Sequence, residues 1–335
     1  MFSGWGNDKT RLSHPPFFII YKKQEGETMK SLNKYFVFSD VHGEYDALRE
    51  ALLDAGYEDN NPNHILVSLG DLFDRGAKSI EIFRFLHGRP HIAVKGNHDC
   101  FFQEYLEKGM DGEFVLFNIL HNGLGATISS FTGTRENVFN VEALDKLRGT
   151  VNSTVLKWLR NMPLYFETEN FIFCHGGLNP NISNWKNTDE QFILWDIEHS
   201  ADPIPSTQKT VMIGHHHAFR VRRQMESRGY KPVPLNTAHY SIVVDGHKVH
   251  KNFRVFGNTD EHAPVSYRNK VAIDGCTNLT GKVNVVVVED YPLDDKVPEE
   301  QPKAQEVSFG ENIDWAAYTT TYTVRNDIGN MTFTI

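Results

Sequence analysis

The sequence predicts an α/β protein built on a mostly parallel or mixed, layered β-sheet. Three observations predict this class. Short apolar segments with the length of buried strands alternate with amphipathic segments of helical period. The loops that join them are short, as in βα units. Several of the apolar segments end in a short polar motif, and open α/β sheets carry such motifs at the carboxyl ends of their strands.

The first elements along the chain form two βα units followed by a third strand. Apolar runs predict strands at residues 35–38, 65–69 and 92–94. Helices are predicted between them, at residues 44–55 and 79–86, because apolar residues recur there at helical spacing and a glycine ends each stretch. Two such units with short loops imply a mostly parallel or mixed sheet.

The later elements are predicted from the same signals. Helical spacing predicts helices at residues 101–108 and 141–160, and Pro163 marks the exit of the second. Apolar and β-branched runs predict further strands at residues 164–167, 171–173, 211–213, 271–274 and 283–288.

The composition divides the chain into three parts. Residues 1–32 are polar and charged and predict a poorly ordered N-terminal extension. Residues 33–290 form one domain, with a β-rich insertion expected at about 218–268 because an Asp-Gly pair separates two β-prone runs there; a plain surface loop is the alternative. Residues 291–335 begin as a linker rich in Pro, Glu, Asp and Lys and end in a stretch that forms a strand or hairpin, or stays loose.

The bulk composition excludes several classes of protein. The chain has 335 residues, of which 40% are apolar, enough for a large core. It has no apolar run of roughly 18 residues, so no membrane partner is expected. The net charge of −9 argues against a surface that coats nucleic acid. Three cysteines are too few for a disulfide framework and fit a reducing compartment, so we expect a cytoplasmic protein.

Five polar motifs carry the chemistry, and each follows a predicted strand. Because the carboxyl ends of such strands meet at one place, the motifs can converge on a single cluster. Their Asp, Asn and His side chains are oxygen and imidazole ligands for metal ions, which predicts a two-metal hydrolase. In chain order the motifs are Asp40-Val-His42-Gly43, Gly70-Asp71-Leu-Phe-Asp74-Arg75-Gly76, Gly96-Asn97-His98-Asp99, His175-Gly176-Gly177 and Gly214-His215-His216-His217.

A two-metal site needs one carboxylate that binds both ions and further ligands around each ion. Asp40 and His42 stand two residues apart at a strand end and can face one ion, whereas Asp71 can bridge both. Asn97 offers a neutral amide oxygen, which leaves the cluster cationic enough to attract phosphate. The predicted metal ligands are Asp40, His42, Asp71, Asn97, His175 and His215.

Three residues beside the predicted cluster suit catalysis. His98 can act as the general acid that protonates a leaving alkoxide. Asp74 can hold the ring of His98 and raise its pKa. Arg75 offers a planar fork of donors for phosphate oxygens.

The motifs resemble those of the calcineurin-like metallophosphoesterases. The run from Gly70 to Gly76, followed by Gly96-Asn97-His98, is similar to the phosphoprotein phosphatase branch. That branch includes bacterial and bacteriophage serine/threonine protein phosphatases and diadenosine tetraphosphate hydrolases. Other similar segments lie at residues 121–129, 159–166 and 271–276, and the resemblance covers about residues 33–290.

The resemblance implies a four-layer αββα sandwich of two mixed sheets flanked by helices, with a dinuclear site at the sheet edges. It implies two divalent metal ions, with Mn²⁺ favoured and Fe or Zn as alternatives. By motif match, the first ion is held by Asp40, His42 and Asp71, and the second by Asp71, Asn97, His175 and His215. His98 with Asp74 is then the acid pair, and Arg75 the phosphate clamp.

The implied activity is the hydrolysis of phosphomonoesters by a hydroxide that bridges the two metals. The expected substrate is a phosphorylated protein or a small phosphate ester, and a serine/threonine protein phosphatase is favoured. A hydrolase of dinucleoside polyphosphates, such as diadenosine tetraphosphate, is the first alternative. A metal-binding scaffold without catalysis is the second.

The sequence departs from the family's pattern at three places. Asp99 stands where the phosphatase branch usually has Glu. The segment Leu194–Ile197 has no Arg where the family often has a second phosphate-binding Arg, and its Trp195 is expected to pack rather than to contact substrate. His217 fits the Gly-His-x-His pattern of wider metallophosphoesterases, so it either touches the first metal or lies outside the ligand set.

Overall fold

A computed structural model describes residues 33–134, 141–235, 240–244, 247–292, 321–326 and 329–334 of the chain. The expectations for residues 1–32 and for the linker over residues 293–320 lie outside the described residues. Within the described ranges, no helix has both the length and the apolar character needed to pass through a bilayer.

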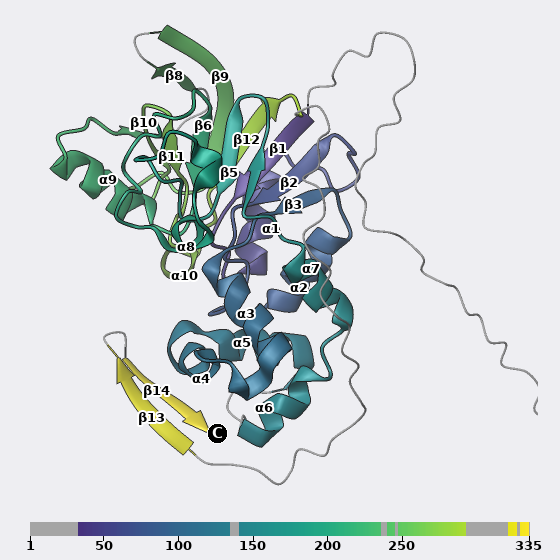
Figure 1. Ribbon diagram of the computed structural model, residues 1–335. Helices are drawn as coiled ribbons and strands as arrows, with labels where there is room; N and C mark the ends of the chain where they lie inside the picture. Colours follow the sequence, from purple (N-terminus) through teal and green to yellow (C-terminus); the bar gives the residue numbers. More distant parts are fainter. Residues whose placement is uncertain are drawn as a thin grey trace, which may run out of the picture. The chain divides into compact units, whose positions relative to one another are not determined.

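Two six-stranded β-sheets form the framework, in the strand orders β3-β2-β1-β12-β9-β8 and β4-β5-β6-β11-β10-β7 (Figure 1). The strands of the first sheet are β1 (Asn33–Phe38), β2 (His64–Ser68), β3 (His91–Ala93), β8 (Tyr240–Val244), β9 (His247–Phe256) and β12 (Val285–Asp290). Those of the second are β4 (Tyr165–Glu167), β5 (Phe171–Cys174), β6 (Thr210–Ile213), β7 (Val233–Pro234), β10 (Val265–Tyr267) and β11 (Lys270–Ala272). β1, β2 and β3 pair in parallel, as do β5, β6 and β11, while β12 and β9 pair antiparallel to their neighbours. The predicted mixed sheet is therefore confirmed, and there are two of them.

The helices divide between the outer faces of the two sheets. Those that share an apolar core cluster with the first sheet are α1 (Tyr45–Asp54), α2 (Ser79–His87), α3 (Asn97–Lys108), α4 (Val115–Phe117), α5 (Leu124–Thr132), α6 (Val141–Arg148) and α7 (Ser153–Arg160). Of these, α4, α5 and α6 lie beyond α3, away from the strands (Figure 1). Those packed on the second are α8 (Glu190–Trp195) and α9 (Ala218–Ser227). Shorter turns are η1 (Gly109–Asp111), η2 (Asn118–Asn122), η4 (Trp185–Asn187) and α10 (Thr277–Thr280).

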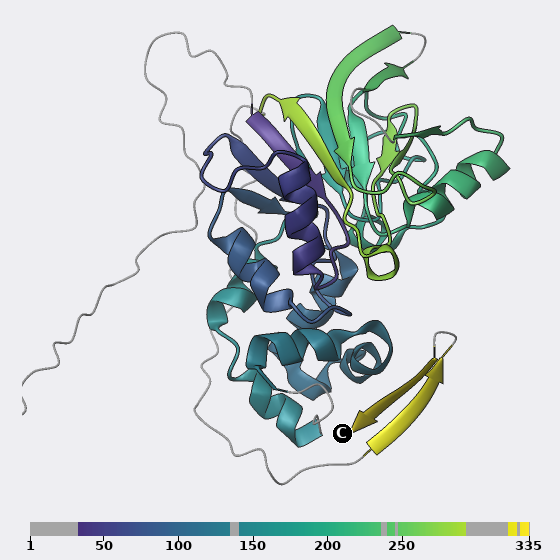
Figure 2. The ribbon, with the colours of Figure 1, turned by 180° about the vertical axis from the view of Figure 1, so that it is seen from behind.

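Alternation along the strands shows the order of the layers, because successive side chains of a strand point to opposite faces. In β1, Phe36 packs against the helices of the first sheet, whereas its neighbour Val37 packs between the two sheets. In β5, Phe173 packs between the sheets and Ile172 packs toward α8 and α9. The layers therefore run helices, sheet, sheet, helices, and the four-layer αββα sandwich implied by the resemblance is confirmed. Figure 2 shows the purple helix α1 over the strands of the first sheet.

Two helical predictions differ from the structure. The spacing predicts a helix from residue 101, but α3 begins at Asn97, because the Asp99 carboxylate accepts the N–H of Gly96 at 2.9 Å and caps the first turn. The helix predicted over residues 141–160 is two helices, α6 and α7. The Asn152 side chain accepts the N–H of Thr154 at 2.8 Å and begins the second one.

The segment at about 218–268 contains a helix as well as strands. It begins with α9, whose buried face is formed by Ala218, Val221 and Met225. Its strands then join both sheets, since β9 pairs with β12 and β10 pairs with β11. β8 and β9 form an antiparallel pair on either side of residues 245–246, where the Asp-Gly pair predicts a hairpin. Near the C-terminus, β13 (Thr321–Asn326) and β14 (Gly329–Thr334) form a two-stranded antiparallel sheet.

Candidate metal centre

The five predicted motifs lie at the carboxyl ends of β1, β2, β5 and β6 and in the first turn of α3, which follows β3. Two glycines let the motifs approach one another. A Cβ atom at Gly214, after β6, would lie 2.5 Å from Oδ2 of Asp40, after β1. A Cβ atom at Gly70 would lie 2.8 Å from Nδ1 of His175. Only glycine leaves room for these approaches, and they join the polar edges of the two sheets into one cluster.

Six predicted site residues have a left-handed backbone although none is glycine, with φ between 48° and 70°. A non-glycine residue in this conformation costs about 1–3 kcal/mol and persists where the surrounding structure enforces it. Such strain gathers at functional sites, and here it gathers at the predicted motifs. The six residues are Asp40, His42, Asp71, Asp74, Arg75 and His215.

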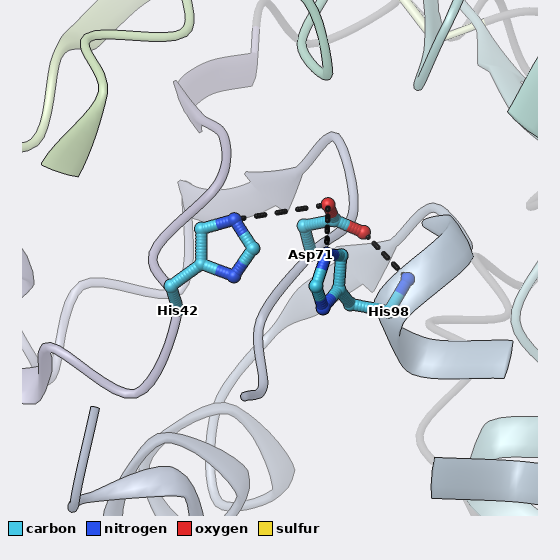
Figure 3. Close-up of side chains that lie close together, drawn as sticks. All are labelled: His42, Asp71 and His98. Carbon is cyan, nitrogen blue, oxygen red and sulfur yellow. Dashed lines mark hydrogen bonds and ion pairs between the residues drawn. The ribbon is translucent and has the colours of Figure 1, made fainter. Parts of the chain in front are cut away.

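Asp71 lies at the centre of the cluster (Figure 3). Its Oδ2 is 3.8 Å from Nε2 of His42 and 4.0 Å from Nε2 of His98, while its Oδ1 accepts the backbone N–H of His98 at 2.9 Å. Oδ1 is also 3.3 Å from Nε2 of His175. Two groups of possible metal ligands follow, and the ligand atoms within each group lie within 4.8 Å of one another: His42, Asp71 and His98, and Asp71, His175 and His215. Asp71 belongs to both groups, which is the place expected of a bridging carboxylate.

Backbone carbonyls fix the orientation of two of these imidazoles. Nδ1 of His42 is 3.0 Å from the carbonyl oxygen of Phe73, and Nδ1 of His175 is 2.7 Å from that of Leu69. A carbonyl oxygen only accepts, so Nδ1 carries the hydrogen in both rings and Nε2 faces Asp71. A carbonyl behind the ring is a common way to orient a metal-ligating histidine.

The remaining predicted ligands line the same cluster. Oδ1 of Asn97 is 2.9 Å from Nε2 of His175. Oδ2 of Asp40 accepts the N–H of His215 at 3.0 Å and the hydroxyl hydrogen of Ser39. The ring centroids of His175 and His215 are 4.9 Å apart. The structure therefore brings all six predicted metal ligands to one place.

The buried charge of the cluster fits bound cations. Asp40, Asp71 and Asp274 are each at most 3% exposed. Burial raises the pKa of Asp40 to about 6, and repulsion from Asp71 adds to this rise. Burial and repulsion from Asp40 raise the pKa of Asp274 well above its usual range. Bound cations would offset the repulsion among these buried carboxylates, and a set of oxygen and imidazole donors suits Mn, Fe or Zn.

The side chains of His98 and Asp74, which the sequence predicts to act as an acid pair, are within hydrogen-bond distance. Nδ1 of His98 lies 2.8 Å from Oδ2 of Asp74. Thr127 in α5 orients Asp74, because its hydroxyl donates to Oδ1 at 2.8 Å and accepts the N–H of Asp74 at 2.7 Å. Burial acts to lower the pKa of His98, but the charges of Asp71 and Asp74 outweigh it and raise that pKa above its ordinary value. Thr127 is missing from the predicted site, although it lies in the segment 121–129 that resembles the family.

Arg75 spans two imidazoles of the cluster. Its Nη1 is 2.8 Å from Nε2 of His42, and its Nη2 is 3.1 Å from Nε2 of His98. The backbone N–H of Arg75 donates to the carbonyl of Gly123 at 3.1 Å, which ties this strained residue to the start of α5. The guanidinium therefore lies at the first ligand group, as expected for a phosphate clamp.

Two acidic residues outside the predicted set support the cluster. The fully buried carboxylate of Asp99 accepts the N–H groups of Asp71 at 3.0 Å, Leu72 at 3.1 Å and Gly96 at 2.9 Å. It thereby fixes the loop after β2 to the start of α3. Oδ2 of Asp274 is 3.8 Å from Nε2 of His217, and His217 belongs to neither ligand group among the described residues.

Comparisons with known proteins agree with this geometry. The profile of a family described as "Calcineurin-like phosphoesterase" matches residues 34–251. The chain is 28% identical to the bis(5′-nucleosyl)-tetraphosphatase PrpE [asymmetrical] of Bacillus subtilis. The match extends over 175 residues and covers 48% of this chain and 65% of that protein. It is 29% identical over 147 residues to a symmetrical bis(5′-nucleosyl)-tetraphosphatase of Vibrio cholerae (43% of this chain, 45% of that protein).

Two further similarities are shorter or weaker. Serine/threonine-protein phosphatase 2 of Escherichia coli is 36% identical over 81 residues, which cover 24% of this chain and 36% of that protein. A solved metallophosphoesterase from Sphaerobacter thermophilus has a TM-score of 0.40 at 15% identity, covering 78% of this chain and 89% of that one. The chain thus spans 65% or less of the length of these three curated relatives.

Proposed function

The chain belongs to the calcineurin-like phosphoesterase family and is a metallophosphoesterase, and we propose that it hydrolyses phosphate monoesters, with phosphoserine and phosphothreonine in proteins as substrates. The observation that carries this proposal is that two ligand groups share Asp71, while His98 of the first group is held by Asp74 and contacts Arg75. Such an arrangement combines cation sites for a phosphate with a proton donor for the oxygen that leaves.

The residues of the chain divide the work of this reaction. When bound by the predicted ligands, two divalent cations would neutralise phosphate charge and lower the pKa of a nearby water toward neutrality. Arg75 binds phosphate oxygens with its planar guanidinium. His98 gives a proton to the leaving alkoxide from Nε2, while Asp74 holds the Nδ1–H and keeps the ring in place. In the structure Arg75 donates to Nε2 of His98, so a phosphate that draws Arg75 to itself frees this nitrogen to carry the proton.

The proposal is tested by turnover of the purified protein with Mn²⁺. The substrates are p-nitrophenyl phosphate and a phosphoserine peptide, and the matched variant is His98→Asn. We expect hydrolysis of both substrates and a large loss of rate in the variant. Equal and negligible rates in both proteins would favour the metal-binding scaffold instead.

Hydrolysis of dinucleoside polyphosphates is the second candidate. It is favoured by the relatives from Bacillus subtilis and Vibrio cholerae, both of which are named tetraphosphatases. Initial rates on diadenosine tetraphosphate and on the phosphoserine peptide, at equal concentrations with Mn²⁺, separate the two candidates. A clear preference for the nucleotide would replace the protein phosphatase.

The metal and the location are part of the same proposal. We favour Mn²⁺, with Fe or Zn as alternatives, and elemental analysis of active protein decides among them. A cytoplasmic location is supported by the three cysteines, Cys100, Cys174 and Cys276, which are all free thiols.

A further inference from the structure

Helix α9 begins at the candidate metal centre. Its first residue, Ala218, follows His217 directly, and the N–H of Ala218 donates to the carbonyl of Asp274 at 2.8 Å. The N–H of Arg220 donates to the carbonyl of His217 at 2.9 Å. The first turn of α9 is therefore fixed to the loop after β11 that holds Asp274, and Arg220 lies in this turn.

The guanidinium of Arg220 lies over Phe219, whose ring stacks on the histidine that precedes α9. Its central carbon is 5.7 Å from the centroid of the Phe219 ring, and that ring stacks on His217 with centroids 5.6 Å apart. Arg220 also interacts electrostatically with His217 and Cys276, and Arg75 acts on the same two residues. The two arginines thus share two neighbours.

Arg220 is exposed, and none of the ion pairs among the described residues includes it. Arg223, three residues further along α9, lies at the same distance of 5.7 Å from the Phe219 ring, but its Nη2 is 3.8 Å from Oε2 of Glu261. Arg223 therefore has an acidic side chain within reach, whereas no ion pair within the described ranges engages Arg220. A free guanidinium offers several donors in one plane, which match the oxygens of a phosphate.

The segment beside His215 of the second ligand group contains no cationic side chain. The ring of Trp195 is 6.3 Å from that of His215, so the segment Leu194–Ile197 lies at the site, yet it contains no Lys or Arg. Trp195 is 40% exposed and Ile197 is 53% exposed, and the ring of Trp195 packs against that of Phe101 with centroids 5.7 Å apart. This segment presents apolar surface and leaves phosphate oxygens to be bound from elsewhere.

We propose that Arg220 binds the phosphate oxygens of the substrate together with Arg75, as the second cationic contact of the site. The inference rests on the proposed hydrolysis of phosphate esters. In this proposal Arg220 takes no part in the proton transfer from His98 to the leaving oxygen. Its loss therefore weakens binding of substrate and of product phosphate more than it slows the chemical step.

The test compares Arg220→Gln with the matched control Arg223→Gln, which removes an equal charge from the same helix. The probe is inorganic phosphate, titrated into the Mn²⁺-loaded protein by calorimetry, and the second readout is KM and kcat for p-nitrophenyl phosphate. Loss of one charge-assisted contact is expected to raise the Kd for phosphate and the KM about tenfold in Arg220→Gln, with kcat changed less than threefold. Arg220→Lys should recover part of the affinity, and Arg223→Gln should match the wild type. Melting temperature and metal content are measured for each variant to confirm folding and loading.

The outcomes separate this inference from the proposed function. If the wild type hydrolyses phosphate esters and Arg220→Gln binds phosphate as the wild type or as Arg223→Gln does, the role of Arg220 is refuted and the function stands. If the wild type hydrolyses no phosphate ester and Arg220→Gln alone still weakens phosphate binding, the anion contact stands and the function does not.

Discussion

The imidazole of His98 and the carboxylate of Asp74 form a buried hydrogen bond, with 2.8 Å between Nδ1 and Oδ2. Asp74 is in turn held by Thr127, so the ring of His98 has one fixed orientation. Nε2 of His98 points toward Asp71 at 4.0 Å, on the side of the ligand groups. The geometry is that of an oriented proton donor, and it leads to the first prediction.

Replacing the donor should affect poor leaving groups more than good ones. His98→Asn is expected to lower kcat on a phosphoserine peptide about 10²- to 10⁴-fold, because an alkoxide leaves slowly without a proton. The loss on p-nitrophenyl phosphate should be smaller, since p-nitrophenolate leaves readily unprotonated. Steady-state kinetics with Mn²⁺ on both substrates measure this ratio. An equal loss on both would assign His98 to binding rather than to proton transfer.

Asp71 is expected to be essential for loading of both ions. Asp71→Asn keeps the shape of the side chain but removes the charge shared by the two ligand groups, so metal content should fall from two ions per chain toward one or none. Elemental analysis after gel filtration measures it. Asp46→Asn is the control, because the Asp46 side chain is 76% exposed and lies outside the cluster. Unchanged metal content in Asp71→Asn would contradict a bridging role.

Asp99 is expected to matter for stability as well as for activity. Asp99→Ala removes the acceptor of three backbone N–H groups in a buried place, which should lower the free energy of unfolding by about 3 kcal/mol. Asp99→Asn keeps one oxygen acceptor and should lie between the wild type and the Ala variant. Urea unfolding of the three proteins gives the order. If all three unfold at the same urea concentration, the N–H groups find other partners.

The burial of Lys270 is expected to make the free energy of unfolding rise with pH in the alkaline range. Burial in β11 lowers its pKa from 10.5 to about 8, and its Nζ donates to the carbonyl of His199 at 3.2 Å. Between these two pH values the unfolded chain holds a proton that the folded chain has released, so this residue makes the free energy of unfolding rise as the pH rises from about 8 to about 10.5. Below pH 8 both states hold the proton, and the cost of burying the charge is constant at about 3 kcal/mol.

Lys270→Met isolates this effect, because the variant shares every other titrating group. The difference in unfolding free energy between the wild type and Lys270→Met should shift by about 3 kcal/mol in favour of the wild type between pH 8 and pH 10.5. Urea unfolding at three pH values measures it. A difference that stays constant over this range would show that Lys270 titrates normally.

The parts of the fold that could be predicted from the sequence are those with local signals. Strands β1, β2 and β3 are each a short apolar run followed directly by a motif that contains Gly and Asp. The signal for each strand and for its end therefore lies within a few residues of sequence. The start of α3 could not be predicted, because the apolar pattern of the helix begins only at residue 101. The capping residue, Asp99, belongs to a polar motif that the pattern assigns to a loop. The break between α6 and α7 rests on Asn152, a short cap inside a stretch with continuous helical spacing.

The parts of the site that could not be predicted depend on contacts across long stretches of chain. Thr127 and Asp74 are 53 residues apart, and Asp99 and Asp71 are 28 residues apart, so no spacing rule connects them. The burial of Lys270 could not be predicted either. A lysine in a strand normally indicates a side chain exposed to solvent, whereas β11 is an inner strand of the second sheet. The convergence of the six candidate ligands could be predicted, because each belongs to a motif whose position at or just after a strand end is a local property.

The layer of side chains between the two sheets has a consequence for the chemistry at their edge. Asp71 is carried by one sheet and His175 by the other, and Val37 and Phe173 belong to the hydrocarbon that keeps these sheets apart. Protein interiors are close-packed, so one methylene more or less in that hydrocarbon moves one sheet against the other. The volume of these buried side chains therefore sets the spacing between Asp71 and His175. We expect substitutions that change this volume to alter the affinity of the candidate centre for metal ions, although they touch no ligand.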